Sequence, residues 1–313
     1  MLFDKYGRPV TCLRITITHK CNYRCFYCHM EGEEGGDELT VNDVARLVRV
    51  GKELGIDKVK LTGGEPLFRH DVVDVVRAIS RIGVTDLAMT TNGSLLKELV
   101  AELIDAGLKR VNVSLPSLKR GVFKRITGVD ALNSVVEGLL MAKDFDLRPI
   151  KLNVVLLRGL NDGEVFDLME FAGRHDFILQ VIELEPLGVD YQLYDKYHVP
   201  LDPIEEWLKS KAVKVEERKD MHNRRQYDLG YVKVELVRAV NNPDFCMHCT
   251  RLRVTANGKL KPCLMRSDNL IDVLGALRRG ASDEELRELF VRAVELREPY
   301  FKGECEAKRA KIC

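Results

Sequence analysis

Short β-rich runs alternate with amphipathic helical stretches along the first 190 residues, and this alternation strongly restricts the possible folds. It predicts parallel strands joined by helical crossovers. The expected strands are Cys12–Thr18, Lys58–Thr62, Asp86–Thr91, Arg110–Leu115, Ile150–Leu157 and Ile178–Glu185. The expected helices are Val41–Gly55, Asp71–Gly83, Leu95–Gly107, Asn133–Phe145 and Glu164–His175. Such α/β units form either a doubly wound sheet or an incomplete barrel, and in both folds ligands gather at the carboxyl ends of the strands.

The alternation fades after Pro186. A helix is expected around Ile204–Ser210, followed by a basic, irregular segment at Lys209–Arg225 and a strand at Tyr231–Val237. Asn257–Gly258 is typical of a hairpin turn, here within Arg253–Lys261. We therefore predict a core at residues 1–190 and a C-terminal region at residues 191–313.

Composition excludes several classes of function. The chain has 313 residues, with 49 Lys plus Arg against 48 Asp plus Glu, and a formal net charge of +1. This balance argues against non-specific binding of nucleic acids or acidic lipids. No apolar run reaches the ~18–20 residues that cross a bilayer, and Met1–Arg8 has no apolar stretch of the signal-peptide kind. We expect a cytoplasmic protein with no nucleic-acid or membrane partner.

Nine cysteines suggest metal or redox chemistry, because disulfides are rare in a reducing compartment. Cys21, Cys25 and Cys28 have CxxxCxxC spacing directly after the first expected strand. Three thiolates on a [4Fe–4S] cluster leave one iron open to another ligand. Structural zinc is the alternative, with His19 or His29 as a fourth ligand. The spacing favours the cluster.

Gly63, Gly64 and Glu65 end the second expected strand within a TGGEP motif. Adjacent glycines allow a ligand close to the backbone, and Glu65 offers a carboxylate acceptor. With the first cysteine trio, this motif resembles the radical S-adenosylmethionine (SAM) superfamily. The resemblance implies a partial (β/α)6 barrel of TIM type, in which SAM binds the open iron. Tyr27 matches the aromatic position whose backbone contacts the adenine.

A second trio comprises Cys246, Cys249 and Cys263. Alone it is typical of a zinc ribbon that lacks one ligand, and His248, Cys305 or Cys313 could supply it. Arg251 and Arg253 follow at i and i+2, so on a strand they share one face and offer forked donors to phosphates. A solvated strand edge is the alternative interpretation.

The motifs appear in a fixed order: CxxxCxxC, TGGEP, TTNG at Thr90–Gly93, NVSL at Asn112–Leu115, and CxxCTRLR before Cys263. Together they closely resemble the molybdenum cofactor biosynthesis protein A family, the GTP 3′,8-cyclases, over roughly residues 3–303. The resemblance implies a core of residues 1–190 and a region of residues 191–313 that carries a second [4Fe–4S] cluster and binds GTP.

The resemblance also implies roles for individual residues. Catalysis depends on the cluster held by Cys21, Cys25 and Cys28. The second cluster is held by Cys246, Cys249 and Cys263. The SAM contacts are Tyr27, Gly64 and Ser114. The GTP contacts are Arg14, Lys60, Thr90, Lys151, Arg251, Leu252 and Arg253. Lys60 stands where the family commonly has arginine, which keeps the charge but loses the fork.

The implied activity is that of a lyase which converts GTP to (8S)-3′,8-cyclo-7,8-dihydroguanosine 5′-triphosphate, the first step of molybdenum cofactor (molybdopterin) biosynthesis. The implied partners are an unidentified electron donor and a cyclic pyranopterin monophosphate synthase that receives the product. The oligomeric state is expected to be monomer or homodimer.

Three features depart from the family pattern. The chain ends in Arg309–Cys313 instead of two glycines, Glu185 lies in the segment where methionine is common, and Pro116 replaces an acidic residue. One alternative is another radical SAM enzyme with an auxiliary cluster that acts on a peptide or small metabolite. The other is a non-catalytic binding module with two structural zinc sites.

Overall fold

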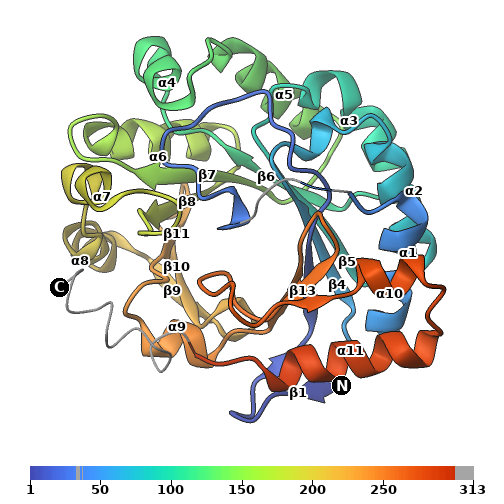
Figure 1. The fold of residues 1–313 in the computed structure, drawn as a ribbon. Coiled ribbons are helices and arrows are strands. Elements are labelled where there is room, and N and C mark those ends of the chain that lie inside the picture. Colours follow the sequence, from blue (N-terminus) through green and yellow to red (C-terminus); the bar gives the residue numbers. More distant parts are fainter. Residues whose placement is uncertain (33–35, 37, 300–313) are drawn as a thin grey trace.

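The computed structural model describes residues 1–32, 36 and 38–299. Its centre is a curved sheet whose six middle strands run parallel, with helices around the outside (Figure 1). These strands are β3 (Cys12–Thr16), β4 (Lys58–Thr62), β5 (Asp86–Thr91), β6 (Arg110–Ser114), β7 (Ile150–Leu156) and β8 (Ile178–Glu183). They confirm the six strands predicted from sequence, with ends that differ by at most two residues.

The predicted crossover helices are also present, again within two residues of their expected ends. They are α1 (Val41–Glu53), α2 (Val72–Arg81), α3 (Leu96–Asp105), α5 (Leu132–Asp144) and α6 (Val165–Arg174). The sequence prediction missed the short helix α4 (Arg120–Thr127), which ends at the left-handed Gly128. Alternation along β3 buries Leu13 and Ile15 in the core, while Arg14 lines the interior cavity.

The C-terminal region extends the same sheet at both edges. β11 (Lys233–Val237) pairs in parallel with β8, and β12 (Arg251–Val254) pairs in parallel with β3. β10 (Arg224–Asp228) and β9 (Lys214–Arg218) continue one edge as an antiparallel hairpin. β13 (Lys259–Lys261) and β14 (Ile271–Asp272) continue the other edge. The 12-stranded sheet ends at β14 and β9, which gives an incomplete barrel as predicted.

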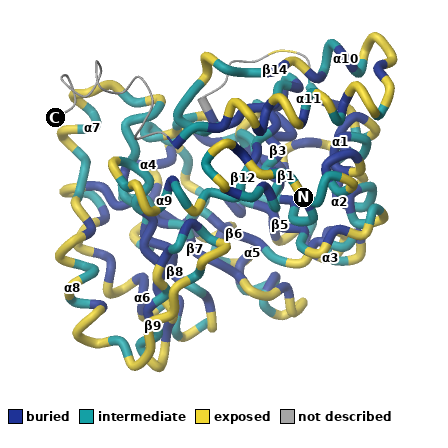
Figure 2. The backbone as a smooth tube through the Cα atoms, turned by 90° about the horizontal axis from the view of Figure 1, so that it is seen from below, coloured by how far each residue is buried: buried dark blue, intermediate teal, exposed yellow. Residues whose placement is uncertain are grey.

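The expectation of an irregular segment at Lys209–Arg225 is wrong, because this segment contains β9 and the start of β10. β9 is an edge strand with almost every residue exposed, so it lacks the alternation that identifies a half-buried strand (Figure 2). The expected hairpin turn at Gly258 is confirmed, with φ of 68°.

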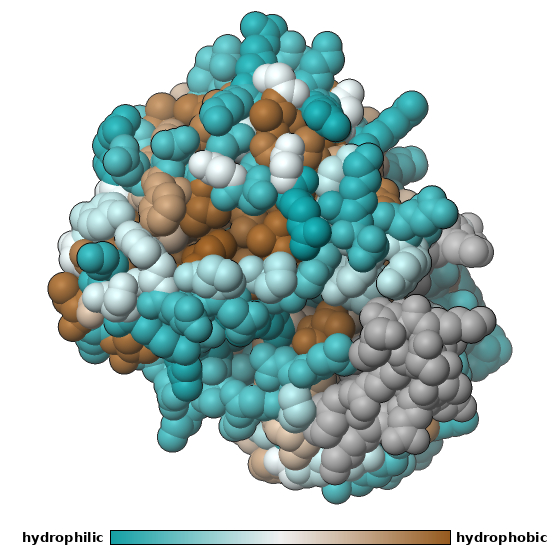
Figure 3. Space-filling model, turned by 90° about the vertical axis from the view of Figure 1, so that its left-hand side faces the viewer, coloured by the Kyte–Doolittle hydropathy of each residue, from teal (hydrophilic) through white to brown (hydrophobic). Residues whose placement is uncertain are grey.

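The remaining elements lie around the barrel. They are β1 (Leu2–Phe3), β2 (Pro9–Val10), α7 (Tyr191–Tyr197), α8 (Asp202–Lys211), α9 (Pro243–Met247), α10 (Leu274–Arg278), α11 (Asp283–Glu295) and 3-10 turns at Met30–Gly32, Pro66–Phe68, Asp162–Glu164 and Lys219–Met221. Hydrophilic side chains cover most of one side of the molecule, where apolar ones gather in a recess (Figure 3). As to membranes, no helix within the described ranges is both long enough and apolar enough to cross a bilayer.

Candidate active site

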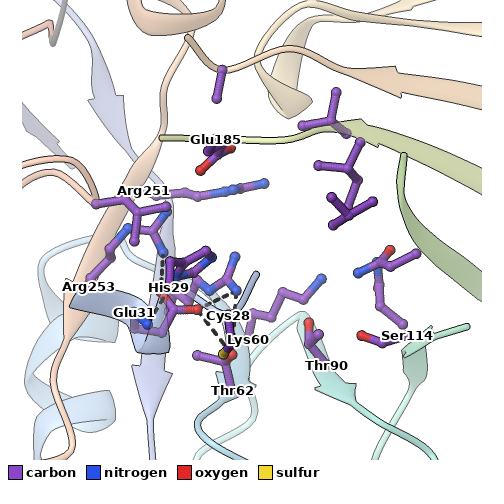
Figure 4. Close-up of a pocket in the computed structure, with 18 of the residues that line it drawn as sticks. Cys28, His29, Glu31, Lys60, Thr62, Thr90, Ser114, Glu185, Arg251 and Arg253 are labelled. Carbon is purple, nitrogen blue, oxygen red and sulfur yellow. Dashed lines mark hydrogen bonds and ion pairs between the residues drawn. The ribbon is translucent and has the colours of Figure 1, made fainter. Parts of the chain in front are cut away.

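Both cysteine trios line one cavity of about 340 Å³ inside the barrel. Cys21, Cys25, Cys28, Cys249 and Cys263 are free cysteines. The same cavity is lined by Arg14, Tyr27, Lys60, Gly64, Thr90, Ser114, Arg251 and Arg253, most of which appear in Figure 4. Residues predicted from distant parts of the sequence thus converge on one space.

The first trio lies on a loop that follows β3 and docks on α4. The backbone N–H of Arg24 donates to Thr127 O at 2.9 Å, and that of Cys28 donates to Cys25 O at 3.0 Å. Burial, with smaller contributions from the neighbouring Cys28 and Cys21, raises the pKa of the Cys25 thiol to about 12. Each thiolate would repel the other two, so the three together favour a bound metal cation. Coordination to a metal deprotonates a thiol and balances the resulting negative charge.

The glycines of TGGEP serve the packing of this loop. A Cβ at Gly64 would lie 2.3 Å from Lys20 O and 2.6 Å from His19 O. The backbone N–H of Gly64 donates to Thr18 O at 2.8 Å, and that of Glu65 donates to Lys20 O at 2.8 Å. The turn at the end of β4 therefore holds the cysteine loop by its backbone, a role that the sequence interpretation did not include.

Glu65 is not a free acceptor, contrary to the sequence interpretation. It is fully buried and accepts from the backbone N–H of Leu67 at 2.9 Å, from Thr91 Oγ1 at 2.5 Å and from the backbone N–H of Asn92 at 2.6 Å. Its carboxylate ties TGGEP to TTNG, so the two motifs form one support beneath the first trio.

We expect Gly64→Ala to lower the free energy of unfolding by about 1–3 kcal/mol, because the added methyl would overlap backbone atoms that cannot rotate away. Gly121→Ala is the matched control. Gly121 lies in α4 with nothing within 4 Å of an added Cβ. Alanine there should be neutral or should stabilise the helix by about 0.5–1 kcal/mol. Thermal unfolding of both variants measures the difference, and equal effects would contradict this role of Gly64.

The second trio lies at the opposite end of the neighbouring strand. β12 is parallel to β3, with Arg251 opposite Cys12, so Cys249 precedes the amino end of β12 whereas Cys21 follows the carboxyl end of β3. Strands of five residues separate the two ends by about 16 Å. The first trio therefore lies at the carboxyl ends of the parallel strands, where ligands were expected, and the second trio lies at the opposite end.

His248, proposed as the fourth zinc ligand of the second trio, is directed elsewhere in the structure. His248 Nδ1 lies 3.1 Å from Asp244 Oδ1 and is not among the cavity-lining residues. Cys305 and Cys313 lie outside the described residues. Within residues 1–32, 36 and 38–299, no group of three His, Cys, Asp or Glu side chains could hold a single metal ion. Three cysteines at each end fit an iron–sulfur cluster better than a closed tetrahedral ion, which needs four ligands.

Three cations form a row across adjacent strands. Arg253 of β12 is in register with Arg14 of β3, which is in register with Lys60 of β4. Arg251 lies two residues before Arg253 on the same side of β12, and all four line the cavity (Figure 4). This row confirms that Arg251 and Arg253 share one face.

Glu31 is a site residue that the sequence analysis missed. Its carboxylate lies 2.7 Å from Arg14 Nη2 and 3.3 Å from Arg253 Nη1, and these contacts are drawn in Figure 4. Burial would raise the pKa of Glu31, but Arg14 and Arg253 outweigh it, so the pKa lies far below its ordinary value. The sequence signal was weak, because one acidic residue after Cys28 belongs to no recognised motif.

Lys60 and Arg251 have no such counter-ion. In the part of the chain that the structure describes, neither side chain forms a hydrogen bond or an ion pair. Burial lowers the pKa of Lys60 well below its ordinary value, and Arg14 adds to this effect. Burial followed by Arg14 and Arg224 lowers the pKa of Arg251 to about 9. Two half-buried cations without a carboxylate favour an anionic ligand in the cavity.

Two predicted GTP contacts do not line the cavity. Leu252 is fully buried in the apolar core, on the opposite face of β12 from its arginine neighbours. Lys151 lies on β7, where its Nζ is 2.6 Å from Glu235 Oε1. By contrast, Thr90 has a buried Oγ1 without a hydrogen-bond partner at the cavity, which suits a ligand contact.

Comparison with known proteins agrees with this geometry. Residues 15–172 match the Radical SAM superfamily, and residues 177–303 match Molybdenum Cofactor Synthesis C. In structure, the chain is similar to Streptococcus suis SuiB bound to S-adenosylmethionine, with a TM-score of 0.62, 16% identity, and coverage of 82% of this chain and 60% of that one. The barrel and the three-cysteine loop after its first parallel strand define a radical SAM protein.

Full-length relatives specify the family further. A Thermococcus kodakarensis protein named "Probable GTP 3′,8-cyclase" is 54% identical over 96% of this chain and 100% of its own length. A Pyrococcus horikoshii protein of the same name is 50% identical over 96% of this chain and 98% of its own. The chain belongs to the GTP 3′,8-cyclase family of radical SAM enzymes, as its motifs predicted.

Proposed function

We propose that this protein converts GTP to (8S)-3′,8-cyclo-7,8-dihydroguanosine 5′-triphosphate, the lyase reaction that begins molybdenum cofactor biosynthesis. Family membership over the full length supports this function. The observation that carries it is the convergence of both cysteine trios and a row of cations on one cavity.

We assign Cys21, Cys25 and Cys28 to one [4Fe–4S] cluster, with Tyr27, Gly64 and Ser114 beside SAM. Free thiols and a backbone cradle too tight for a Cβ fit such a cluster. When bound, the cluster and SAM supply one-electron chemistry that removes a hydrogen atom from the substrate. The residues of this chain would orient the two ligands and limit access of water to the cavity.

We assign Cys246, Cys249 and Cys263 to a second [4Fe–4S] cluster at the other end of the cavity. Arg14, Lys60, Arg251 and Arg253 would bind the triphosphate, and Thr90 would donate a hydrogen bond. Holding the nucleotide at its base and its phosphates fixes the ribose between them. Leu252 and Lys151 are retained as proposed contacts, although in the structure their side chains face the core and Glu235.

A radical SAM enzyme that acts on a peptide is the alternative from the same superfamily. Four cavity cations, of which two lack a counter-ion, favour a polyphosphate over a peptide. Two structural zinc sites would leave this cationic row without a function. The test is anaerobic incubation with SAM, a reductant and GTP, followed by identification of the product by mass. Cleavage of SAM without cyclised GTP would contradict the proposed substrate.

We expect Arg253→Ala to weaken GTP binding about 10- to 100-fold, as loss of a charge-assisted hydrogen bond worth about 1.5–3 kcal/mol requires. Slow uncoupled cleavage of SAM should persist, since the first trio is intact. Arg120→Ala is the control, because Arg120 is an exposed arginine of α4 that pairs with Asp130. The affinity for GTP, measured by calorimetry, should not change in the control. An unchanged affinity in Arg253→Ala would contradict the proposal that Arg253 binds the triphosphate.

We further propose a cytoplasmic location, an electron donor yet to be identified, and transfer of the product to a cyclic pyranopterin monophosphate synthase. The division into a core of residues 1–190 and a region of residues 191–313 stays a proposal. Both parts share one sheet through the β8–β11 and β3–β12 pairs, which supports their folding as a unit.

A further inference from the structure

Residues near both ends of the described chain meet behind the second cysteine trio. Arg8 Nη1 donates to the carbonyl oxygen of Cys246 at 2.8 Å, and Arg297 Nη2 donates to the carbonyl oxygen of Cys249. The Arg8 and Arg297 side chains are only 5% and 1% exposed. Two long cationic side chains are therefore buried to hold the backbone of two cysteines.

Asp4 orients both guanidinium groups. Its Oδ2 accepts from Arg8 Nε at 2.8 Å and lies 3.2 Å from Arg297 Nη1, and the carboxylate is completely buried. Its Oδ1 accepts from the backbone N–H of Arg8 at 3.0 Å, which closes the turn that presents Arg8. One carboxylate between two guanidinium groups leaves one net positive charge within these three side chains.

This charge lies close to sulfur. The Arg297 guanidinium interacts with the Cys249 thiol, and its Nε is buried without a hydrogen-bond partner. A buried donor without an acceptor is costly, so it marks a position where an acceptor belongs. Sulfur atoms of a cluster accept such bonds, and these bonds together with nearby charge set the reduction potential.

We propose that Arg8, Arg297 and Asp4 are positioning residues for the second cluster. The two arginines fix the backbone of Cys246 and Cys249 and keep the potential of that cluster more positive than the cysteines alone would. The negative charge of Asp4 reduces the positive shift in potential that the two arginines cause. The inference rests on the proposed function, which places a cluster on Cys246, Cys249 and Cys263.

The test is a redox titration of the reconstituted protein followed by electron paramagnetic resonance, with the first cluster as internal reference. Arg8→Gln and Arg297→Gln each remove a positive charge, so the potential of the second cluster should become more negative. Asp4→Asn removes the opposing charge, so the potential should become more positive. The first cluster should not shift. If these residues had a purely structural role, the potential of the second cluster would not shift in opposite directions in the arginine variants and in Asp4→Asn.

Two further variants separate charge from geometry. Lys5→Gln removes a positive charge next to Asp4 in sequence, but the Lys5 side chain is 53% exposed. Solvent should screen it and leave both potentials unchanged. Arg297→Lys keeps the positive charge but loses the several N–H donors of the guanidinium group. The second cluster should then lose iron to a chelator faster than in the unmodified protein, while its potential shifts less than in Arg297→Gln.

Iron analysis distinguishes failure of this inference from failure of the proposed function. Two clusters require about eight iron ions per chain, one cluster about four. A content of four in the unmodified protein would overturn the second cluster, and the inference with it. A content of eight, with unchanged potentials or shifts of one sign in Asp4→Asn and Arg297→Gln, would overturn the inference alone.

Discussion

Replacement of Cys25 by alanine is expected to abolish cleavage of SAM and all formation of cyclised product. Cys25 is one of three free thiols on the loop after β3, and a cluster left with two thiolates loses the site that binds SAM. Cys249→Ala should differ, because its trio lies at the far end of the cavity. SAM should still be cleaved, whereas cyclised product should fall below detection. Chromatography of 5′-deoxyadenosine and of the nucleotide product measures both reactions.

Cys12→Ala is the matched control for these variants. Cys12 is a half-buried free cysteine at the start of β3 and is not among the residues that line the cavity. Its replacement removes a thiol from the same strand, so cleavage and cyclisation should continue. Formation of 5′-deoxyadenosine by Cys25→Ala at the rate of Cys12→Ala would exclude the assignment of the first cluster.

The barrel strands were predictable because each carries its own local signal. Leu13 and Ile15 alternate with Arg14, and burial follows this alternation in the structure. The cysteine trios were predictable because metal ligands have restricted spacing along the chain. Where local pattern and tertiary environment agree, sequence alone places the residue correctly.

The ion pairs behind the site were not predictable. Glu31 meets Arg253, and Asp4 meets Arg297, across more than 200 residues of sequence, so no local pattern joins them. The exposed edge strand β9 was missed for a related reason, since it has no buried face to impose alternation. Which charged groups become buried depends on which strands lie next to each other. The order of the strands is a property of the whole sheet, so it cannot be inferred from a short stretch of sequence.

The position of Glu235 illustrates this point. It lies on β11, fully buried, and its Oε1 is 2.6 Å from Lys151 Nζ and also accepts from Arg218 and from Gln226 Nε2 at 2.7 Å. Burial would raise the pKa of Glu235, but Lys151 and Arg224 outweigh it and lower the pKa to about 2. One carboxylate therefore balances several cations at the edge where the C-terminal region joins the barrel.

We expect Glu235→Gln to lower the free energy of unfolding by about 3–5 kcal/mol, because it leaves buried cations without a counter-ion. Glu137→Gln is the control, since Glu137 pairs with Lys97 on the surface and should change stability by about 0.5 kcal/mol or less. Thermal unfolding at neutral pH compares the two.

Combining Glu235→Gln with Lys151→Met should recover part of the lost stability, because it removes one unpaired charge at nearly constant volume. This recovery identifies the cause as charge imbalance, since a defect of packing would make the double variant less stable than either single one. Strictly additive losses would contradict the pairing of Lys151 with Glu235. They would instead support the interpretation that Lys151 turns into the cavity toward a phosphate, as the family resemblance implies.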